Sequence, residues 1–318
     1  MSHICVTGAN GFVGRALCHL SLDQGHQVTA LVRQRGGCVD GVREWLCPGQ
    51  DFTDIETAQW PSEPIDTLVH AAARVHVMNE RMADPLAAFR ATNVEGALRI
   101  ARQAHARGVK RFVFVSSIKA VAEISTDHAL REDDAPQPQD PYGQSKYEAE
   151  QALRRFGESS GLDIVIVRPP LVYGPGVGAN FLRLMRAIVS GMPLPLVRAK
   201  RSMVYIDNLA SALLCCAFDP RAAHGCFHVA DGDDLTVVDL ARALGQYLHR
   251  PARLIPVPGS WLRLAGRLTN RSAQARRLSD ELRVDATRIR VTLDWQPPYT
   301  IDQGLAATAT WYSQTQIN

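Results

Sequence analysis

The sequence predicts an α/β fold, with a doubly wound parallel sheet and a smaller C-terminal lobe, and three observations support this. Short runs of β-branched and aromatic residues alternate with helix-like stretches through the first half of the chain. Three glycines spaced three residues apart follow the first of these runs. After about residue 174, proline and glycine become frequent and the alternation stops. Repeated strand, helix and strand units predict parallel strands that helices cover on both faces.

The predicted elements follow the chain in order. Apolar runs bounded by Gly, Asp or Lys are interpreted as buried strands over 4–7, 28–32, 67–73, 112–116 and 164–167. Helices are predicted between them over 12–24, 86–107 and 145–159. Gly25, Gly108 and Gly161 lie just past the ends of these helices, where glycine commonly terminates a helix. The whole sheet is expected to contain about seven strands.

The composition excludes several classes of protein. Apolar residues make up 46% of the chain and charged residues 21%, which excludes a disordered or coiled-coil protein. The net charge of +3 is too small and too dispersed for a nucleic-acid partner. The longest apolar run, 209–218, is far shorter than the roughly 20 residues that cross a bilayer, so no membrane partner is expected. The seven cysteines lack metal-binding spacing and no signal peptide is recognised, which predicts reduced thiols, no metal and a cytoplasmic location.

A glycine-rich turn lies between the first predicted strand and the first predicted helix. Gly8 allows the tight turn, Gly11 lets the backbone approach a pyrophosphate, and Gly14 lets the helix pack closely on the strand. Phosphates bind the free N–H groups at the positive end of such a helix. The turn therefore predicts a Rossmann-type dinucleotide site. Its predicted contacts are Gly8, Asn10, Gly11, Phe12 and Val13.

The end of the second predicted strand bears on which dinucleotide binds. An acid there would hold the ribose hydroxyls of NAD, but Arg33 and Arg35 suit the 2′-phosphate of NADP. NADP(H) is therefore favoured over NAD(H), and the competing interpretation is that both arginines are ordinary surface charges. An acidic and an aromatic residue at 51–52 are expected at the adenine, and a run of alanines at 71–73 is small enough to pass beneath the cofactor. These further predicted contacts are Asp51, Phe52, Ala71, Ala72 and Ala73.

Three residues are predicted to carry the chemistry. Tyr142 and Lys146 are four residues apart, on one face of a helix that would begin near residue 140. A phenol with a pKa of about 10 is a poor base, and a neighbouring ammonium would stabilise the phenolate. Ser117 follows the predicted strand 112–116, where its hydroxyl can hydrogen-bond the substrate oxygen that gains or loses a proton. The trio predicts oxidation of a hydroxyl group or reduction of a carbonyl group.

These motifs together resemble the extended short-chain dehydrogenases/reductases of the NAD-dependent epimerase/dehydratase family. The pattern is nearest to enzymes that act at C4 of nucleotide sugars, and it covers nearly the whole chain. It includes T-G-x-x-G-x-x-G at 7–14, N-V-E-G at 93–96, the Ser/Tyr/Lys trio, R-P-P-L-V-Y-G-P at 168–175, Y-I-D-N-L-A at 205–210 and L-D-W-Q-P at 293–297. Residues 1–174 are then expected to form the dinucleotide-binding unit with the catalytic residues. Residues 175–318 would form mainly a substrate-binding lobe, with some segments returning to the main sheet.

The resemblance implies further roles. Asn180 and Arg201 match the asparagine and arginine that hold the nucleotide diphosphate in the family's 4-epimerases. Arg74 is expected on the sugar side of the substrate and Pro169 beside the cofactor. A second phosphate-binding arginine stays open among Arg276, Arg277 and Arg283. A homodimer, paired through the helices predicted over 86–107 and 145–159, is implied by analogy.

Departures from the family pattern bear on the reaction. The family's 4,6-dehydratases place an acid directly after the position of Ser117, whereas Ile118 and Lys119 follow it here, so dehydration is not expected. The favoured function is NADPH-dependent 4-keto reduction of a UDP-4-keto-6-deoxy-hexosamine for surface polysaccharide. The alternative is a 4-epimerase of UDP-hexose or UDP-N-acetylhexosamine. A third hypothesis is a non-enzymatic NADP-sensing protein.

Overall fold

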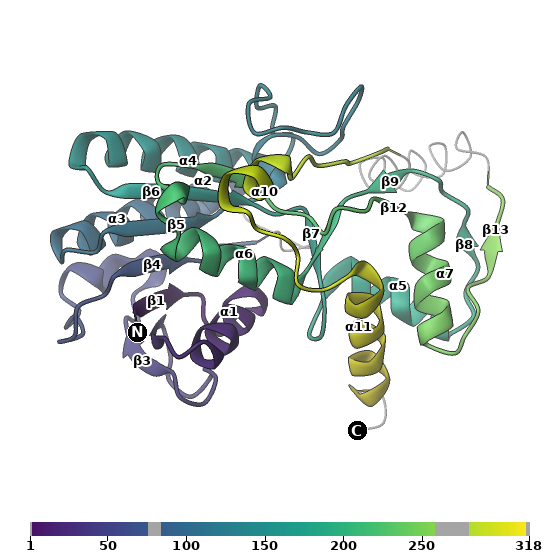
Figure 1. The fold of residues 1–318 in the computed structure, drawn as a ribbon, viewed down its shortest axis with the longest axis horizontal. Coiled ribbons are helices and arrows are strands. Elements are labelled where there is room, and N and C mark those ends of the chain that lie inside the picture. The colour runs from purple at the N-terminus through teal and green to yellow at the C-terminus, as the bar shows by residue number, and fades with distance from the viewer. Residues whose placement is uncertain (1, 76–83, 258–279, 316–318) are drawn as a thin grey trace.

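A parallel sheet flanked by helices forms the left-hand part of the molecule in Figure 1. In the computed structural model, which describes residues 2–75, 84–257 and 280–315, this sheet has seven strands in the order β11-β6-β5-β4-β1-β2-β3. Every neighbouring pair is parallel. The strands are β1 (His3–Thr7), β2 (Gln27–Val32), β3 (Arg43–Leu46), β4 (Thr67–His70), β5 (Arg111–Val115), β6 (Asp163–Arg168) and β11 (Cys226–His228). The prediction of a doubly wound parallel sheet is confirmed.

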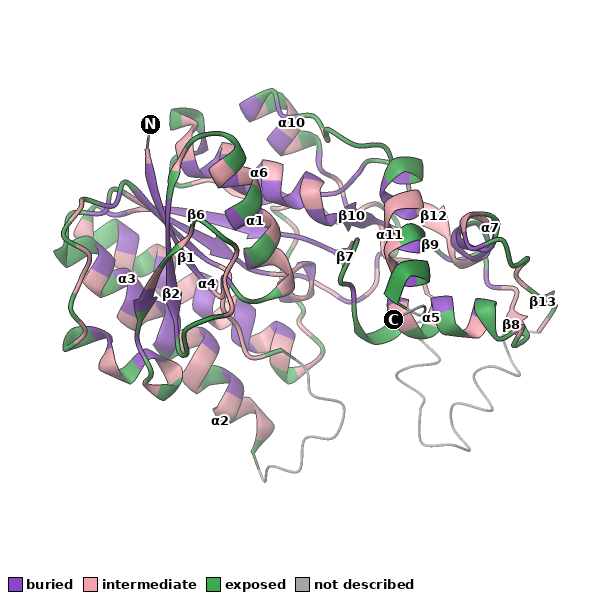
Figure 2. Cartoon of the chain, turned by 90° about the horizontal axis from the view of Figure 1, so that it is seen from below, coloured by how far each residue is buried: buried purple, intermediate pink, exposed green. Residues whose placement is uncertain are grey.

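Helices cover both faces of the sheet, because successive strand residues point to opposite sides. In β1, Ile4 and Val6 pack on one side and Cys5 packs on the other, and all three are fully buried. Figure 2 shows the buried strands between the two groups of helices. The first side is covered by α1 (Phe12–Asp23), α6 (Ile206–Phe218) and α10 (Thr287–Leu293). The second is covered by α3 (Ala97–Ala106) and α4 (Pro141–Ser160).

The predicted elements of the first half are present with shifted ends. The strand predicted over 67–73 ends at His70. α4 begins at Pro141, as the placement of Tyr142 and Lys146 on one helical face requires and four residues before the start of the segment 145–159. The helix predicted over 86–107 is divided into α2 (Pro85–Arg90), a π-helical turn η2 (Ala91–Gly96) and α3. Such turns shift the register of a helix and are frequent at functional sites. Short 3₁₀ turns are η1 (Gln50–Glu56), η3 (Ile118–Ala120) and η4 (Pro220–Ala222).

The rest of the second half forms a lobe that continues from the carboxyl end of β6. Its elements are β7 (Leu171–Tyr173), α5 (Ala179–Val189), β8 (Leu194–Pro195), β9 (Lys200–Arg201), β10 (Met203–Tyr205), β12 (Leu235–Thr236), α7 (Val237–Tyr247), β13 (Leu254–Ile255) and α11 (Ile301–Thr315). Short strands pair β7 with β10, β9 with β12, and β8 with β13. Tyr173, Met185, Leu244 and Leu305 lie in the core of the lobe.

A buried carboxylate connects the lobe to the main sheet. Asp231, three residues after β11, accepts a hydrogen bond of 2.9 Å from the Tyr173 hydroxyl and one of 2.8 Å from the Asn208 amide. The backbone N–H of Tyr205 also donates to it at 3.0 Å. Burial raises the pKa of this carboxyl, and the three donors oppose that effect. The carboxylate therefore fixes β7, β10 and α6 against the end of β11.

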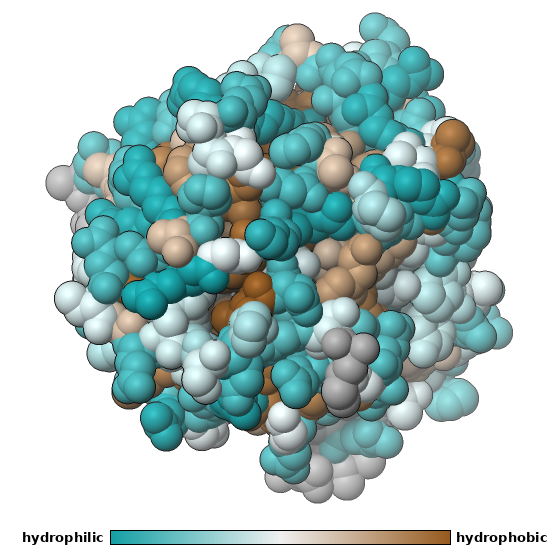
Figure 3. Space-filling model, turned by 60° about the vertical axis from the view of Figure 1, so that its left-hand side comes forward, coloured by the Kyte–Doolittle hydropathy of each residue, from teal (hydrophilic) through white to brown (hydrophobic). Residues whose placement is uncertain are grey.

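The surface is mainly polar where one face of it is seen (Figure 3). Hydrophilic side chains cover most of this face, and the apolar atoms gather in small hollows. None of the helices in the described ranges combines the length and the apolar character needed to cross a bilayer.

Candidate active site

The glycine-rich turn is as tight as its sequence predicts. Gly8 has a φ of 70°, and a Cβ placed on it would lie 2.7 Å from the backbone nitrogen of Ala72. A Cβ on Gly14 would lie 2.2 Å from the Gly8 carbonyl oxygen, so the helix contacts the turn directly. α1 follows Gly11, and no side chain caps its first N–H groups. Uncapped N–H groups beside a strand end suit a pyrophosphate, so the residues present match a dinucleotide.

The other residues predicted to contact the cofactor lie near the strand ends beside this turn. The backbone N–H of Ala72 donates to the Thr7 hydroxyl at 3.2 Å, which holds the alanine run against the turn. The Thr92 hydroxyl donates to the Asp51 carboxylate. Phe52 is buried, and its ring centroid lies 5.6 Å from that of His70. The structure thus groups 51–52 and 71–73 around the ends of β1 and β4.

The three residues predicted to carry the chemistry lie near the carboxyl end of β5. Tyr142 lies in the first turn of α4, which Asp140 caps by accepting the Gly143 N–H at 2.7 Å. The Ser117 side chain is a polar neighbour of the Tyr142 hydroxyl and lowers its pKa. Lys146 Nζ donates to the carbonyl of Val115 at 2.6 Å, two residues before Ser117. The carboxyl ends of parallel strands are where ligands bind in open α/β sheets.

An ion pair holds the segment after Ser117 against the start of α4. Lys119 Nζ lies 2.6 Å from an Asp140 oxygen and 2.9 Å from a Glu123 oxygen. Asp140 therefore caps the helix that carries Tyr142 and also anchors the turn that carries Ser117. This arrangement fixes the two hydroxyl groups relative to one another.

Burial dominates the ionisation of the trio. It raises the pKa of Tyr142 to about 12, with a smaller contribution from the Asp140 carboxylate, while the Ser117 side chain acts in the opposite direction. It lowers the pKa of Lys146 to about 7, while the Glu150 carboxylate acts in the opposite direction. The phenol is therefore neutral at neutral pH in this state. A cationic ring bound beside it would lower its pKa.

A buried ion pair between Glu150 and Arg168 lies one turn of α4 beyond Lys146. Glu150 follows Lys146 by one helical turn, and its side chain is fully buried. It accepts hydrogen bonds from Arg168 at 2.9 and 2.5 Å and from the Ser116 hydroxyl at 2.5 Å. Glu150 was not among the predicted site residues. The available signal was its spacing, because 142, 146 and 150 share one face of the helix.

The π-helical turn brings another buried side chain to the site. Asn93 accepts the backbone N–H of Arg74 at 2.8 Å and donates to the carbonyl of Arg74 at 3.1 Å. It also donates to the hydroxyl of Ser145, on α4, at 2.9 Å. The Arg74 guanidinium lies 5.9 Å from the Phe89 ring centroid, which in turn is 6.0 Å from that of Tyr142. Arg74 is thereby held close to the trio.

The remaining predicted residues lie around this centre. The Pro169 carbonyl accepts the Ile118 N–H at 2.9 Å, next to Ser117. Asn180 is exposed in the first turn of α5, and Arg201, on β9, donates to the carbonyl of Asp280 at 2.7 Å. Arg33 is exposed directly after β2. Of the arginines considered for a second phosphate contact, Arg276 and Arg277 lie outside the described residues, and Arg283 pairs with Glu281 at 3.0 Å.

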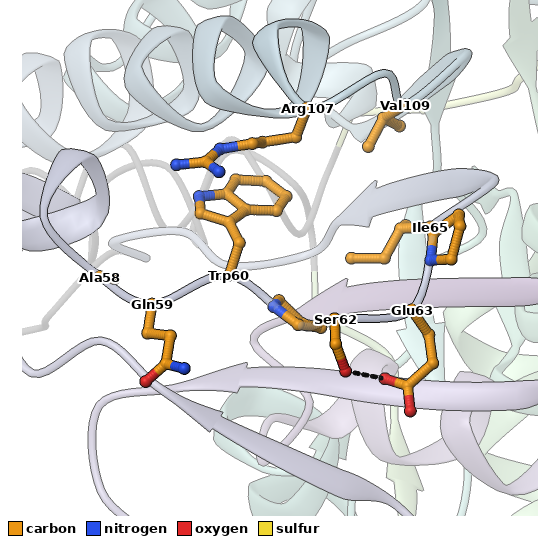
Figure 4. Close-up of a pocket in the computed structure, with 10 residues that line it drawn as sticks. Ala58, Gln59, Trp60, Ser62, Glu63, Ile65, Arg107 and Val109 are labelled. Atoms are coloured by element: carbon orange, nitrogen blue, oxygen red, sulfur yellow. Dashed lines mark hydrogen bonds between the residues drawn. The ribbon is translucent and has the colours of Figure 1, made fainter.

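A pocket of about 430 Å³ lies elsewhere (Figure 4). Residues 58–65, which lead into the amino end of β4, form one wall, and Arg107 and Val109, which precede β5, form the other. The Arg107 guanidinium lies 5.9 Å from the centroid of the Trp60 ring. The pocket is therefore at the amino ends of the strands, on the opposite edge from the trio.

Comparisons with known proteins identify a family and a fold for this chain. The model of the NAD dependent epimerase/dehydratase family matches residues 4–229. A UDP-glucose 4-epimerase of Vibrio cholerae is 38% identical over 316 residues, covering 98% of this chain and 95% of that protein. The crystal structure of a UDP-glucose 4-epimerase from Thermotoga maritima with UDP-glucose has a TM-score of 0.77 at 21% identity, covering 99% of both chains. A UDP-glucuronic acid 4-epimerase from Bacillus cereus in complex with NAD has a TM-score of 0.78 at 18% identity, covering 98% of this chain and 96% of that one.

Proposed function

The chain belongs to the NAD-dependent epimerase/dehydratase family, and from that premise we propose that it inverts C4 of a UDP-hexose or UDP-N-acetylhexosamine. Three observations support the proposal: Ser117 lowers the pKa of Tyr142, Lys146 donates to the last carbonyl of β5, and no side chain caps the glycine-rich turn. The 38% identical relative is named a UDP-glucose 4-epimerase, which favours inversion over the net reduction that the sequence placed first.

The chemistry assigned to the trio is proton transfer at the C4 oxygen. A bound nicotinamide dinucleotide supplies the hydride acceptor and donor. Tyr142 takes the proton of the C4 hydroxyl and later returns it, and Ser117 donates a hydrogen bond to the same oxygen. Lys146 holds the cofactor ribose and stabilises the phenolate. Lowering a phenol pKa from about 12 to about 7 corresponds to about 7 kcal/mol of differential stabilisation. A protonated Lys146 and a positively charged nicotinamide ring would both act in that direction.

The lobe is assigned to the UDP group. Asn180 and Arg201 would hold the diphosphate, since a guanidinium is permanently charged and binds two oxygens at once. Arg74 would face the sugar, because Asn93 holds its backbone beside α4. The sugar can then turn over in the site while its nucleotide stays bound.

A second candidate is the reduction of a UDP-4-keto-6-deoxy-hexosamine with NADPH. It is favoured by Arg33 and Arg35, which are exposed directly after β2, where a 2′-phosphate would lie. In this reaction Tyr142 would donate a proton once to the C4 oxygen, and NADPH would supply the hydride. NADP(H) is thus the proposed cofactor for reduction, and NAD(H) or NADP(H) could serve inversion.

We further place the enzyme in the cytoplasm as a homodimer. The seven cysteines, all within the described residues, are free thiols, as expected in a reducing compartment. α3 and α4 lie side by side on one face of the sheet, and a second copy of this pair would complete a four-helix interface.

One experiment separates the two reactions. The purified protein is incubated with UDP-glucose, UDP-N-acetylglucosamine and a UDP-4-keto-6-deoxy-hexosamine, each with and without NADPH. Inversion predicts interconversion of C4 epimers without added reductant, whereas reduction predicts one NADPH oxidised per keto sugar consumed. The Tyr142→Phe variant should do neither. If the wild type does neither while binding the cofactor, the proposal is wrong.

A further inference from the structure

We propose that Glu44 is an internal anion that competes with the 2′-phosphate of NADP for the loop after β2, and that it thereby sets the choice of dinucleotide. The inference rests on the proposed function only in requiring that a dinucleotide binds the glycine-rich turn. It concerns a residue of β3 that the sequence motifs do not include.

Three consecutive backbone N–H groups converge on the Glu44 carboxylate. Gly36 donates to its two oxygens at 3.0 and 2.9 Å, and Gly37 and Cys38 each donate to one of them at 3.3 Å. The φ of 85° at Gly36 turns these groups to the same side. Consecutive N–H groups in such a turn form an anion-binding nest. These bonds, led by that from Gly36, also hold the pKa of Glu44 below its usual range, so the nest contains a charged group.

This nest lies directly against the glycine-rich turn. The Cys38 thiol donates to the Asn10 side-chain oxygen at 3.0 Å, and Arg15, in the first turn of α1, donates to the carbonyl of Gly37 at 2.7 Å. A Cβ on Gly37 would lie 2.8 Å from the Asn10 side chain, so the contact is close. Because β1 and β2 are paired in register, their carboxyl ends lie side by side. An anion bound in the nest is therefore next to the segment that would receive the adenosine half of a dinucleotide.

The Glu44 carboxylate and a 2′-phosphate are both anions, so they compete for the nest. Arg33 and Arg35 precede it, and together with Arg15 they make this edge of the sheet favourable for an anion. A 2′-phosphate that enters must displace the Glu44 carboxylate or lie beside it, and both cost free energy. NAD carries a neutral hydroxyl at the same position and avoids that cost. Glu44 therefore acts against NADP while the arginines act for it.

The test is a binding titration with the full chain. NADP⁺, NAD⁺, adenosine 2′,5′-bisphosphate and AMP are each titrated into the wild type, Glu44→Gln and Glu44→Lys. Calorimetry measures the binding. Glu44→Gln should tighten NADP⁺ and the bisphosphate by about three- to tenfold, the effect of one unit charge a few ångströms from a dianion near the surface. NAD⁺ and AMP should change by less than about twofold, and the effect should shrink at high salt. Glu44→Lys should tighten NADP⁺ further.

The matched control is Glu63→Gln. Glu63 pairs with Arg43, the neighbour of Glu44 on β3, so this variant removes a negative charge from a residue that contacts the same strand without touching the nest. It should leave the ratio of NADP⁺ to NAD⁺ affinity unchanged. Equal changes for both dinucleotides in Glu44→Gln, or weaker binding of NADP⁺, overturn the role of Glu44 while leaving the proposed function intact. Failure of every dinucleotide to bind every variant overturns both.

Discussion

Lys146 Nζ donates its hydrogen bond to the Val115 carbonyl at 2.6 Å and lies 4.1 Å from the centroid of the Phe114 ring, inside the protein. Burial disfavours the charged form of this amine, so its position lowers the stability of the folded protein wherever the unfolded chain is protonated. In the folded protein the amine makes a hydrogen bond to a backbone carbonyl. This relationship gives the free protein a measurable dependence on pH.

The first prediction concerns that dependence. The folded pKa of Lys146 is about 7 and its ordinary value is 10.5, so between these values the unfolded chain binds the proton and the folded chain does not. Stability should therefore rise with pH across this window by up to about 1.4 kcal/mol per pH unit from this group. Lys146→Met should remove this slope, as measured by urea unfolding at pH 7, 8 and 9. Lys110→Met, at an exposed position, serves as the control and should keep it. An unchanged slope in Lys146→Met would contradict the assignment.

The second prediction concerns the buried ion pair. Glu150→Gln leaves the Arg168 guanidinium without its carboxylate, which should lower the free energy of unfolding by about 3–5 kcal/mol. Replacing both partners, as in Glu150→Leu with Arg168→Met, should cost less than the sum of the single changes, because no charge is then left buried. Urea unfolding measures both. Glu158→Gln, an exposed acid on the same helix, should change stability by less than about 0.5 kcal/mol. Additive single effects would mean that the pair is not coupled.

The third prediction concerns the close contact in the glycine-rich turn. Gly14→Ala puts a methyl group 2.2 Å from the Gly8 carbonyl oxygen, so helix and turn must separate. We expect a loss of about 1–3 kcal/mol in stability and loss of dinucleotide binding. Gly178→Ala is the control, since a Cβ there meets nothing within 4 Å and its φ is −111°. Normal binding by Gly14→Ala would show that the turn does not hold the phosphates.

The fourth prediction separates the two hydroxyl groups of the site. Tyr142→Phe and Ser117→Ala should each lower kcat by about 10²- to 10⁴-fold while the Kd of the dinucleotide stays within about twofold. Because the Ser117 side chain lowers the pKa of Tyr142, Ser117→Ala should also move the acidic limb of the pH–rate profile to higher pH. Tyr147→Phe, on the same helix, should retain activity. A weaker cofactor Kd with unchanged kcat would point to a binding role instead.

The fold could be predicted because its central strands are continuous apolar runs with clear glycine stops. β3 was not predicted because Arg43 and Glu44 interrupt its apolar pattern. β11 was not predicted because it has only three residues. The π-helical turn has no signal in hydrophobic periodicity, which continues through it. These elements owe their structure to pairing with distant segments rather than to local sequence.

The residues of the site also fall into those that the sequence could predict and those that it could not. The glycine turn and the trio are spacing patterns, and a spacing pattern is visible in one dimension. The hydrogen bonds of Asn93 to Arg74 and of Glu150 to Arg168 join residues 18 or 19 positions apart, on different elements. Such pairs become apparent only when the elements are packed together. The nest around Glu44 is of this second kind.

The return of β11 to the sheet makes the two halves of the chain interdependent. Its partner β6 would present an open edge if the chain ended near residue 174, and α6, whose Leu209 and Leu213 pack with Ile4 and Val6, would no longer cover one face. An isolated N-terminal half should therefore aggregate rather than fold, because it would expose both an unpaired strand and a bare apolar surface. Truncation, domain grafting and split-protein designs on this scaffold need to retain the chain at least through His228.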